Sequence, residues 1–222
     1  TAAAAAAAGY ALHRAFYDGG ERTGFFVDKY VPSNNGGTAS SLKNGNPLST
    51  AAAHNPIGGL TGAPATFYYG VIAAAKTRGA TFFPASHFQR AALALLALAH
   101  AQGSTSSAWN AWYDGAGVTN YPKGCNNNAL GDANDAGILY VSDGYSTCGK
   151  TGSANLFSRT THNGQNCGVC DLNGLMWEIS LGRVTETLAT TYSVLKTSVR
   201  MKDMTAGVGG ATDFWGNAAQ LA

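Results

Sequence analysis

The segment THNGQNCGVCDLNGLMWEISLG, residues 161–182, carries the strongest structural signal in this chain of 222 residues. Asn173-Gly174 lies between two short apolar runs, which is the strongest short-range signal for a β-hairpin. Leu172 and Trp177 flank that pair and are expected to anchor the turn in a hydrophobic core. The segment therefore predicts a tight turn that inserts apolar side chains into a small domain.

Two carboxylates bracket this turn. Asp171 opens it, and Glu178 follows Trp177, where a carboxylate beside a buried indole needs backbone amides, an Arg or a metal as its partner. The sequence alone does not choose among these partners. We expect a structural signature, without a catalytic role, from Asp171, Leu172, Gly174, Trp177 and Glu178.

The four cysteines of the chain surround this segment at C-x22-C-x18-C-x2-C spacing. A structural zinc site with four Cys ligands usually has two close pairs, and only Cys167 and Cys170 are close here. Cys125 and Cys148 lie farther upstream. We expect buried thiols or one or two disulfides, with zinc binding or redox chemistry as the alternatives.

Residues 144–151, GYSTCGKT, match the pattern of a phosphate-binding P-loop. A P-loop presents its amides to phosphate at the N-terminus of a long helix. Gly152 follows at once and Asn163-Gly164 soon after, so a long helix is not expected. No later apolar strand ends in an Asp that could hold Mg²⁺, and we therefore expect no nucleotide site.

Two helices are predicted upstream of these motifs. Residues 67–78 form the first, with Gly79 as its C-terminal cap. The second begins with a capping box, in which Ser86 is the N-cap and Gln89 follows three residues later. Its leucines point all round the axis, which predicts a helix buried on most sides. These leucines are Leu93, Leu95, Leu96 and Leu98.

The remaining sequence predicts short strands and long loops. Residues 25–31, FFVDKYV, and residues 138–141, ILYV, are each predicted as a strand, the first ended by Pro32. Residues 32–64 are predicted as a long loop region, and residues 184–204 as an extended excursion or one more strand. This order of elements indicates an α+β fold with short antiparallel strands. We expect residues 1–20 to be a lead-in segment and residues 21–222 to form one domain.

Composition excludes several classes of protein. Charged residues make up 12% of the chain, Gly occurs 29 times and the formal net charge is +2. No Lys/Arg cluster suggests a nucleic-acid partner, and no apolar run is long enough to span a bilayer. No nucleophile and base form a recognisable catalytic pair, and no histidines have metal-ligand spacing. The neutral polar surface is typical of a secreted or virion protein.

Residues 168–178, GVCDLNGLMWE, resemble the G-x-x-D-L/M-x-G-N-V-W-E-W signature of the formylglycine-generating-enzyme family, which has a C-type-lectin-like fold. Residues 26–30 (FVDKY) resemble that family's early F-x-I-D-K-Y-E strand. Residues 82–96 resemble the start of its R-L-P-T-x-x-E-W-E-x-A helix. Residues 121–128 (YPKGCNNN) and 211–218 (ATDFWGNA) resemble segments of the branch found in phage tail proteins and in diversity-generating-retroelement variable proteins.

The chain departs from the family pattern at informative positions. Leu175 stands where the family has Asn close to a structural calcium site, and Ile179 replaces the second Trp. Arg90 stands where the helix usually carries Trp. The family's catalytic cysteines lie beyond the Trp-Glu signature, whereas all four here precede Trp177. The resemblance therefore implies neither oxidase activity nor a bound metal or cofactor, and it implies a domain that is incomplete at its C-terminus.

The resemblance implies a virion surface protein, a phage tail or head fibre component that presents a lectin-like domain to a host cell-surface receptor, either protein or glycan. Other virion proteins and two further copies in a homotrimer are the implied partners, outside the cell and without membrane insertion. Loop aromatics and amides suit recognition at low charge. The candidate ligand-binding residues are Trp109, Trp112, Tyr113, Tyr121, Asn126, Asn127 and Asn128. The alternatives are a structural virion decoration protein, or an enzyme of the formylglycine-generating or P-loop type.

Overall fold

The fold was derived from a computed structural model, which describes residues 1–16, 21–65, 68–102, 122–145, 147–176, 178–180, 183–188 and 192–198. The α-helices in these ranges are α1 (Ala2–Ala7), α2 (Tyr68–Lys76) and α3 (His87–Gln102). The strands are β1 (Pro32–Asn35), β2 (Thr38–Ser41), β3 (Arg183–Leu188) and β4 (Tyr192–Ser198). Short 3-10 turns are η1 (Arg14–Phe16), η2 (Ile57–Gly59) and η3 (Phe157–Thr160). The α+β class is therefore confirmed.

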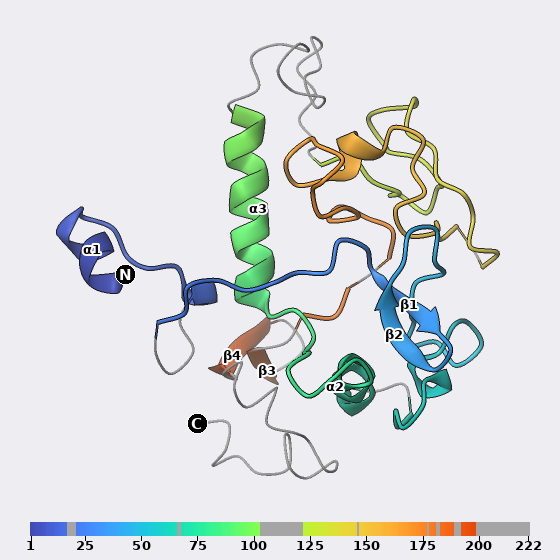
Figure 1. The fold of residues 1–222 in the computed structure, drawn as a ribbon, viewed down its shortest axis with the longest axis horizontal. Helices are drawn as coiled ribbons and strands as arrows, with labels where there is room; N and C mark the ends of the chain where they lie inside the picture. The colour runs from blue at the N-terminus through green and yellow to red at the C-terminus, as the bar shows by residue number, and fades with distance from the viewer. Residues whose placement is uncertain are drawn as a thin grey trace.

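The arrangement places most of the chain beside one long helix. In Figure 1, α3 stands next to the loops of residues 122–176, and the β1–β2 hairpin and α2 lie below those loops. Two apolar clusters form the described core. The first contains Cys125, Ile138, Tyr140, Ala154 and Leu175. The second contains Ala39, Ile57, Leu60 and Ala74, and lies between the hairpin and α2.

The β1–β2 hairpin corrects two sequence predictions. Residues 25–31 are not a strand, because the first strand begins at Pro32, where it was predicted to end. The amides of Tyr30 and Val31 donate to the side chains of Ser41 and Thr151 and are therefore not available to a neighbouring strand. Part of the predicted 32–64 loop forms the hairpin instead.

Glycines explain this hairpin. Asn35 pairs with Thr38 across a two-residue turn in which Gly36 has φ 58° and Gly37 has φ 89°. Positive φ at both central positions belongs to the type I′ turn, whose twist matches that of the flanking strands. A Cβ on Gly37 would lie 2.1 Å from Thr61 Oγ1, so the turn also requires close approach of a second loop.

The two predicted helices are confirmed, with α2 slightly shorter than expected. Gly79 has φ 144°, and its amide donates to the carbonyl of Lys76 at 3.0 Å. The capping box of α3 is complete. The Gln89 amide donates to Ser86 Oγ at 3.2 Å, and the Ser86 amide donates to Gln89 Oε1 at 2.8 Å. Two amide donors of the first helical turn are thereby satisfied.

The prediction that α3 is buried on most sides is wrong. Leu93 is 7% exposed, but Leu95, Leu96 and Leu98 are 57%, 48% and 55% exposed. In Figure 1 the loops of residues 122–176 border the helix on one side, and within the described part of the chain no sheet packs along its other side. A helix that packs along one stripe leaves its other apolar residues at the surface.

The predicted strand at residues 138–141 is also absent. Side chains alternate as in a strand, because Ile138 and Tyr140 are buried while Leu139 and Val141 are 58% and 55% exposed. However, the amides of Leu139 and Val141 donate to the side chains of Asn155 and Ser153 rather than to a neighbouring strand. Only isolated bridges remain, such as that between Gly131 and Leu139.

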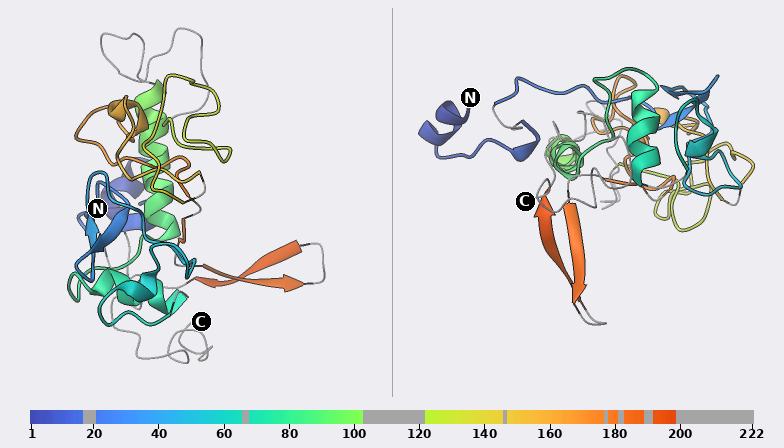
Figure 2. Two further views of the ribbon diagram at one scale, coloured as in Figure 1. Left: turned by 90° about the vertical axis from the view of Figure 1, so that its right-hand side faces the viewer. Right: turned by 90° about the horizontal axis from the view of Figure 1, so that it is seen from below.

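The first and the last described elements, α1 and the β3–β4 pair, extend away from the rest of the described chain. Residues 184–204 were predicted as an extended excursion or one more strand. This region contains most of the antiparallel pair β3–β4, which projects outward in Figure 2. At the other end α1 buries none of its residues. None of the helices in the described ranges combines the length and the apolar character needed to cross a bilayer.

Candidate functional site

A buried carboxylate organises the loops of residues 122–176. Asp171 is 1% exposed, and its oxygens accept hydrogen bonds from Thr151 Oγ1 at 2.7 Å, the Gly152 amide at 2.8 Å and the Tyr140 hydroxyl at 3.2 Å. Burial, and then the Asp171 charge, raise the pKa values of Tyr140 and Cys170. We call Asp171, Thr151, Gly152 and Tyr140 the Asp171 network. It joins three loop segments at one point.

Thr151 connects this network to the N-terminal part of the domain. Its hydroxyl donates to Asp171 and accepts the Val31 amide at 2.9 Å. Its own amide donates to Gly45, and its carbonyl accepts the Asn44 amide at 2.8 Å. Thr151 is fully buried and used in packing, and no α-helix follows it within the described residues 152–176. The expectation that no long helix follows the P-loop-like sequence therefore holds in the described residues.

The turn after Asp171 is tight, but the hairpin predicted at Asn173-Gly174 is absent. The Leu175 amide donates to the Cys125 carbonyl at 2.7 Å, and a Cβ on Gly174 would lie 2.3 Å from that same oxygen. The turn therefore docks onto residues 124–126 instead of folding back on itself. Leu175, 5% exposed, is the core anchor, whereas Leu172 is only half-buried. Trp177 lies outside the described residues.

Glu178 has one of the three kinds of partner that its sequence context suggested. Arg90 of α3 forms an ion pair with it. Burial raises the pKa of Glu178, and the Arg90 guanidinium opposes that shift. Arg90 therefore holds the carboxylate of Glu178 against the first turns of α3.

The four cysteines are free thiols. Cys125 and Cys170 are buried, Cys148 is half-buried and Cys167 is exposed. Burial, followed by the Asp143 charge, raises the pKa of Cys148 to about 12, and burial also raises the pKa of Cys125. Among the described residues, no group of three or more His, Cys, Asp or Glu side chains could hold a metal ion.

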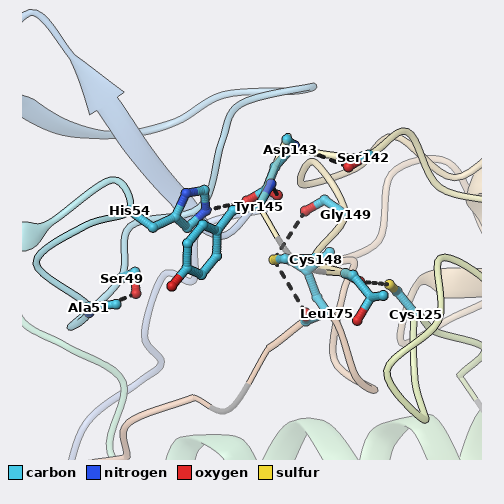
Figure 3. A network of polar contacts seen from close by, with 12 residues as sticks. Ser49, Ala51, His54, Cys125, Ser142, Asp143, Tyr145, Cys148, Gly149 and Leu175 are labelled. Atoms are coloured by element: carbon cyan, nitrogen blue, oxygen red, sulfur yellow. Dashed lines mark hydrogen bonds and ion pairs between the residues drawn. The ribbon is translucent and has the colours of Figure 1, made fainter.

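One polar cluster was not predicted from the sequence. His54 Nε2 donates to Asp143 Oδ2 at 2.5 Å, and the His54 ring stacks on Tyr145 with centroids 4.1 Å apart (Figure 3). Asp143 also accepts the Tyr145 amide at 2.9 Å. Because 89 residues separate His54 from Asp143, no local spacing could have revealed the pair.

Among the described residues, no hydrogen bond joins His54 to a hydroxyl or thiol that could act as a nucleophile. Cys148 lies beside Asp143, but its thiol donates to the carbonyls of Gly149 and Leu175 at 3.7 and 3.4 Å (Figure 3). A thiol with a raised pKa is a weak nucleophile at neutral pH. The contacts of His54 therefore tie the 50–56 loop to the 142–149 loop.

The predicted ligand-binding residues divide into three groups. Asn127 and Asn128 are exposed, with left-handed φ values of 56° and 54°. The side chain of Asn126 is used within its own loop. Its Nδ2 donates to Asp132, and its Oδ1 accepts a hydrogen bond from the Ala133 amide. The four aromatic residues Trp109, Trp112, Tyr113 and Tyr121 lie outside the described residues.

An exposed apolar surface lies on the loops of residues 122–176. Leu139 and Asn155 exchange two hydrogen bonds of 3.0 Å, and Leu156 follows Asn155 in the sequence. Leu156 is 41% exposed, and Val141 lies on the same side of the extended segment as Leu139. We call Leu139, Val141 and Leu156 the apolar loop face. All four residues of the ILYV segment are apolar, so alternating burial must expose two of them, and this was the signal in the sequence.

A separate cavity of about 1030 Å³ lies between the segment of residues 22–32, α2, the start of α3 and residues 169–179. Its wall is mostly apolar and includes Leu172 and the Arg90–Glu178 ion pair. Met176 and Glu178 flank Trp177 in the sequence, and because that indole lies outside the described residues we assign this cavity no ligand.

Comparison with known proteins gave no family for this chain, since no protein-family model and no curated protein matches it.

Proposed function

We propose that this chain is a non-enzymatic virion surface protein, a phage tail or head fibre component that presents a C-type-lectin-like domain to a receptor on the host cell. The proposal rests on the sequence signature from Asp171 to Glu178, on the low fraction of charged residues in the chain and on one structural observation. That observation is the apolar loop face of Leu139, Val141 and Leu156.

Leu139 and Val141 point outward on loops that are held by buried contacts. Ile138 and Tyr140 alternate with them and are 0% and 6% exposed, so the segment cannot turn its apolar side inward. Tyr140 is in turn bonded to Asp171. Binding surfaces are commonly built on loops that a rigid scaffold positions, and clustered exposed apolar residues often mark such surfaces.

The chemistry of the thiols supports binding over catalysis. Burial raises the pKa values of Cys125, Cys148 and Cys170, so these thiols stay protonated at neutral pH. An oxidase of the formylglycine-generating type needs reactive cysteines. A homotrimer would add avidity at a fibre tip, and light scattering of the purified chain tests that part of the proposal.

Receptor binding is tested with the fluorescently labelled chain and a panel of bacterial cells, measured by flow cytometry. We expect saturable binding to a subset of strains, reduced at least fivefold by Leu139→Asp. Leu95→Asp on α3 is the matched control, because Leu95 and Leu139 are 57% and 58% exposed. Binding to no strain, or equal losses in both variants, would overturn the proposal.

A further inference from the structure

Two lysines and two aromatic rings converge beside the apolar loop face. Lys29 Nζ lies 5.2 Å from the ring centre of Phe157 and 5.5 Å from that of Tyr30. Lys43 Nζ lies 5.4 Å from the same Phe157 ring. Phe157 directly follows Leu156 of the apolar loop face, so the two features adjoin. We call Lys29, Lys43, Tyr30 and Phe157 the lysine-aromatic site.

The rings of this site are held in place by the Asp171 network. Tyr30 and Phe157 have centroids 6.1 Å apart and pack over Gly152, whose amide donates to Asp171. A Cβ on Gly152 would lie 2.5 Å from the Tyr30 ring and 3.5 Å from the Phe157 ring. Gly152 also has φ 62°, so both its conformation and this close approach favour glycine. The ring pair is therefore a fixed platform.

The positive charge of the site has no carboxylate partner in the described part of the chain. The ion pairs found there use Asp28, Asp135, Asp143 and Glu178, and none of them joins Lys29 or Lys43. Lys29 donates to the Asn166 carbonyl, which leaves its charge unneutralised. Lys43 is exposed and has the face of Phe157 as its contact.

We propose that the lysine-aromatic site binds an acidic sugar, a pyranose carrying a carboxylate, as found in uronic-acid polysaccharides. The carboxylate would lie between the two ammonium groups, which bind anions as compact point charges. The apolar C–H face of the sugar ring would pack on the platform of Tyr30 and Phe157. This inference rests on the proposed function and specifies the chemistry of the receptor.

The test measures the Kd of the purified chain for trigalacturonate by isothermal titration calorimetry, with neutral galactotriose and inorganic phosphate as comparison ligands. We expect Lys43→Gln to weaken trigalacturonate binding about threefold, because an exposed ion pair contributes up to about 1 kcal/mol. Lys29→Gln with Lys43→Gln should weaken it about tenfold, and added salt should weaken it further. Phe157→Leu should reduce it as well.

Lys76→Gln removes the same charge from α2, outside the lysine-aromatic site, and should leave the Kd unchanged. Equal binding of trigalacturonate and galactotriose, equal binding of phosphate, or equal effects of Lys43→Gln and Lys76→Gln would overturn the inference. If Lys43→Gln leaves cell binding intact while Leu139→Asp abolishes it, the proposed function stands and the acidic-sugar site fails. If the chain binds trigalacturonate but binds no cells, the acidic-sugar site stands and the proposed function fails.

Discussion

Replacement of Asp171 by alanine should be among the most damaging single substitutions in the described part of this protein. The side chain is 1% exposed and accepts hydrogen bonds from Thr151, Gly152 and Tyr140. Alanine would leave these three donors buried without their acceptor. It would also occupy a backbone position with φ 59°, where Asp and Asn are tolerated better than Ala.

The expected cost follows from these contacts. Each buried donor left without a partner costs about 1–3 kcal/mol, and the left-handed conformation adds about 1 kcal/mol for Ala. Partial relaxation of the loops lowers the sum, and we expect a loss of about 4 kcal/mol in the free energy of unfolding. Asp171→Asn keeps one carbonyl acceptor and the tolerance of positive φ, so it should lose about half as much.

Urea denaturation followed by circular dichroism measures these losses. With a denaturant slope of about 2 kcal/mol per M, Asp171→Ala should lower the midpoint by about 2 M. Asp135→Ala is the control, because it removes an ion pair with Arg159 at 2.7 Å at the edge of the same loops and should cost about 1 kcal/mol. Equal midpoints for the two alanine variants would refute the central role of Asp171.

Three further predictions test other parts of the structure. Gly124→Ala should destabilise the fold by about 3 kcal/mol in the same urea assay, because its Cβ would lie 1.5 Å from a carbonyl oxygen of the facing turn. The Cβ of Gly24→Ala would meet nothing within 4 Å, so this control variant should be neutral. Iodoacetamide should alkylate the exposed Cys167 first, and Cys148, with a pKa of about 12, should stay unmodified in the folded protein at pH 8 by mass spectrometry. Burial and a neighbouring histidine lower the pKa of His162. The unfolded chain therefore binds the proton more tightly, the free energy of unfolding should fall as pH drops below about 6.5, and His162→Gln should reduce that fall.

The turn at residues 171–175 shows where sequence reasoning succeeds and where it stops. Asp171 was expected to open a tight turn, and it does so with a left-handed backbone. Leu172 was expected to anchor this turn in the core together with Trp177, but it is only half-buried, and Leu175 is buried instead. Leu175 is buried because its amide bonds the Cys125 carbonyl, and that contact depends on a segment 50 residues away in the sequence.

Features that depend on neighbouring residues could be predicted from the sequence. The capping box of Ser86 and Gln89 involves amides within one helical turn, and Gly79, with φ 144°, follows the end of α2 by three residues. The α+β class follows from the same local patterns. In each case the physical cause, a nearby hydrogen bond or an allowed φ, lies within a few residues of the signal.

Contacts between groups that are distant in the sequence could not be predicted, because they depend on how the loops pack. Val31 bonds Thr151 across 120 residues, His54 bonds Asp143 across 89, and Arg90 bonds Glu178 across 88. The sequence predicts that a buried carboxylate needs a partner, but the packing of the loops determines which residue that partner is. The same packing leaves the two predicted strands unpaired, because side chains of other loops bind amides that a neighbouring strand would have used.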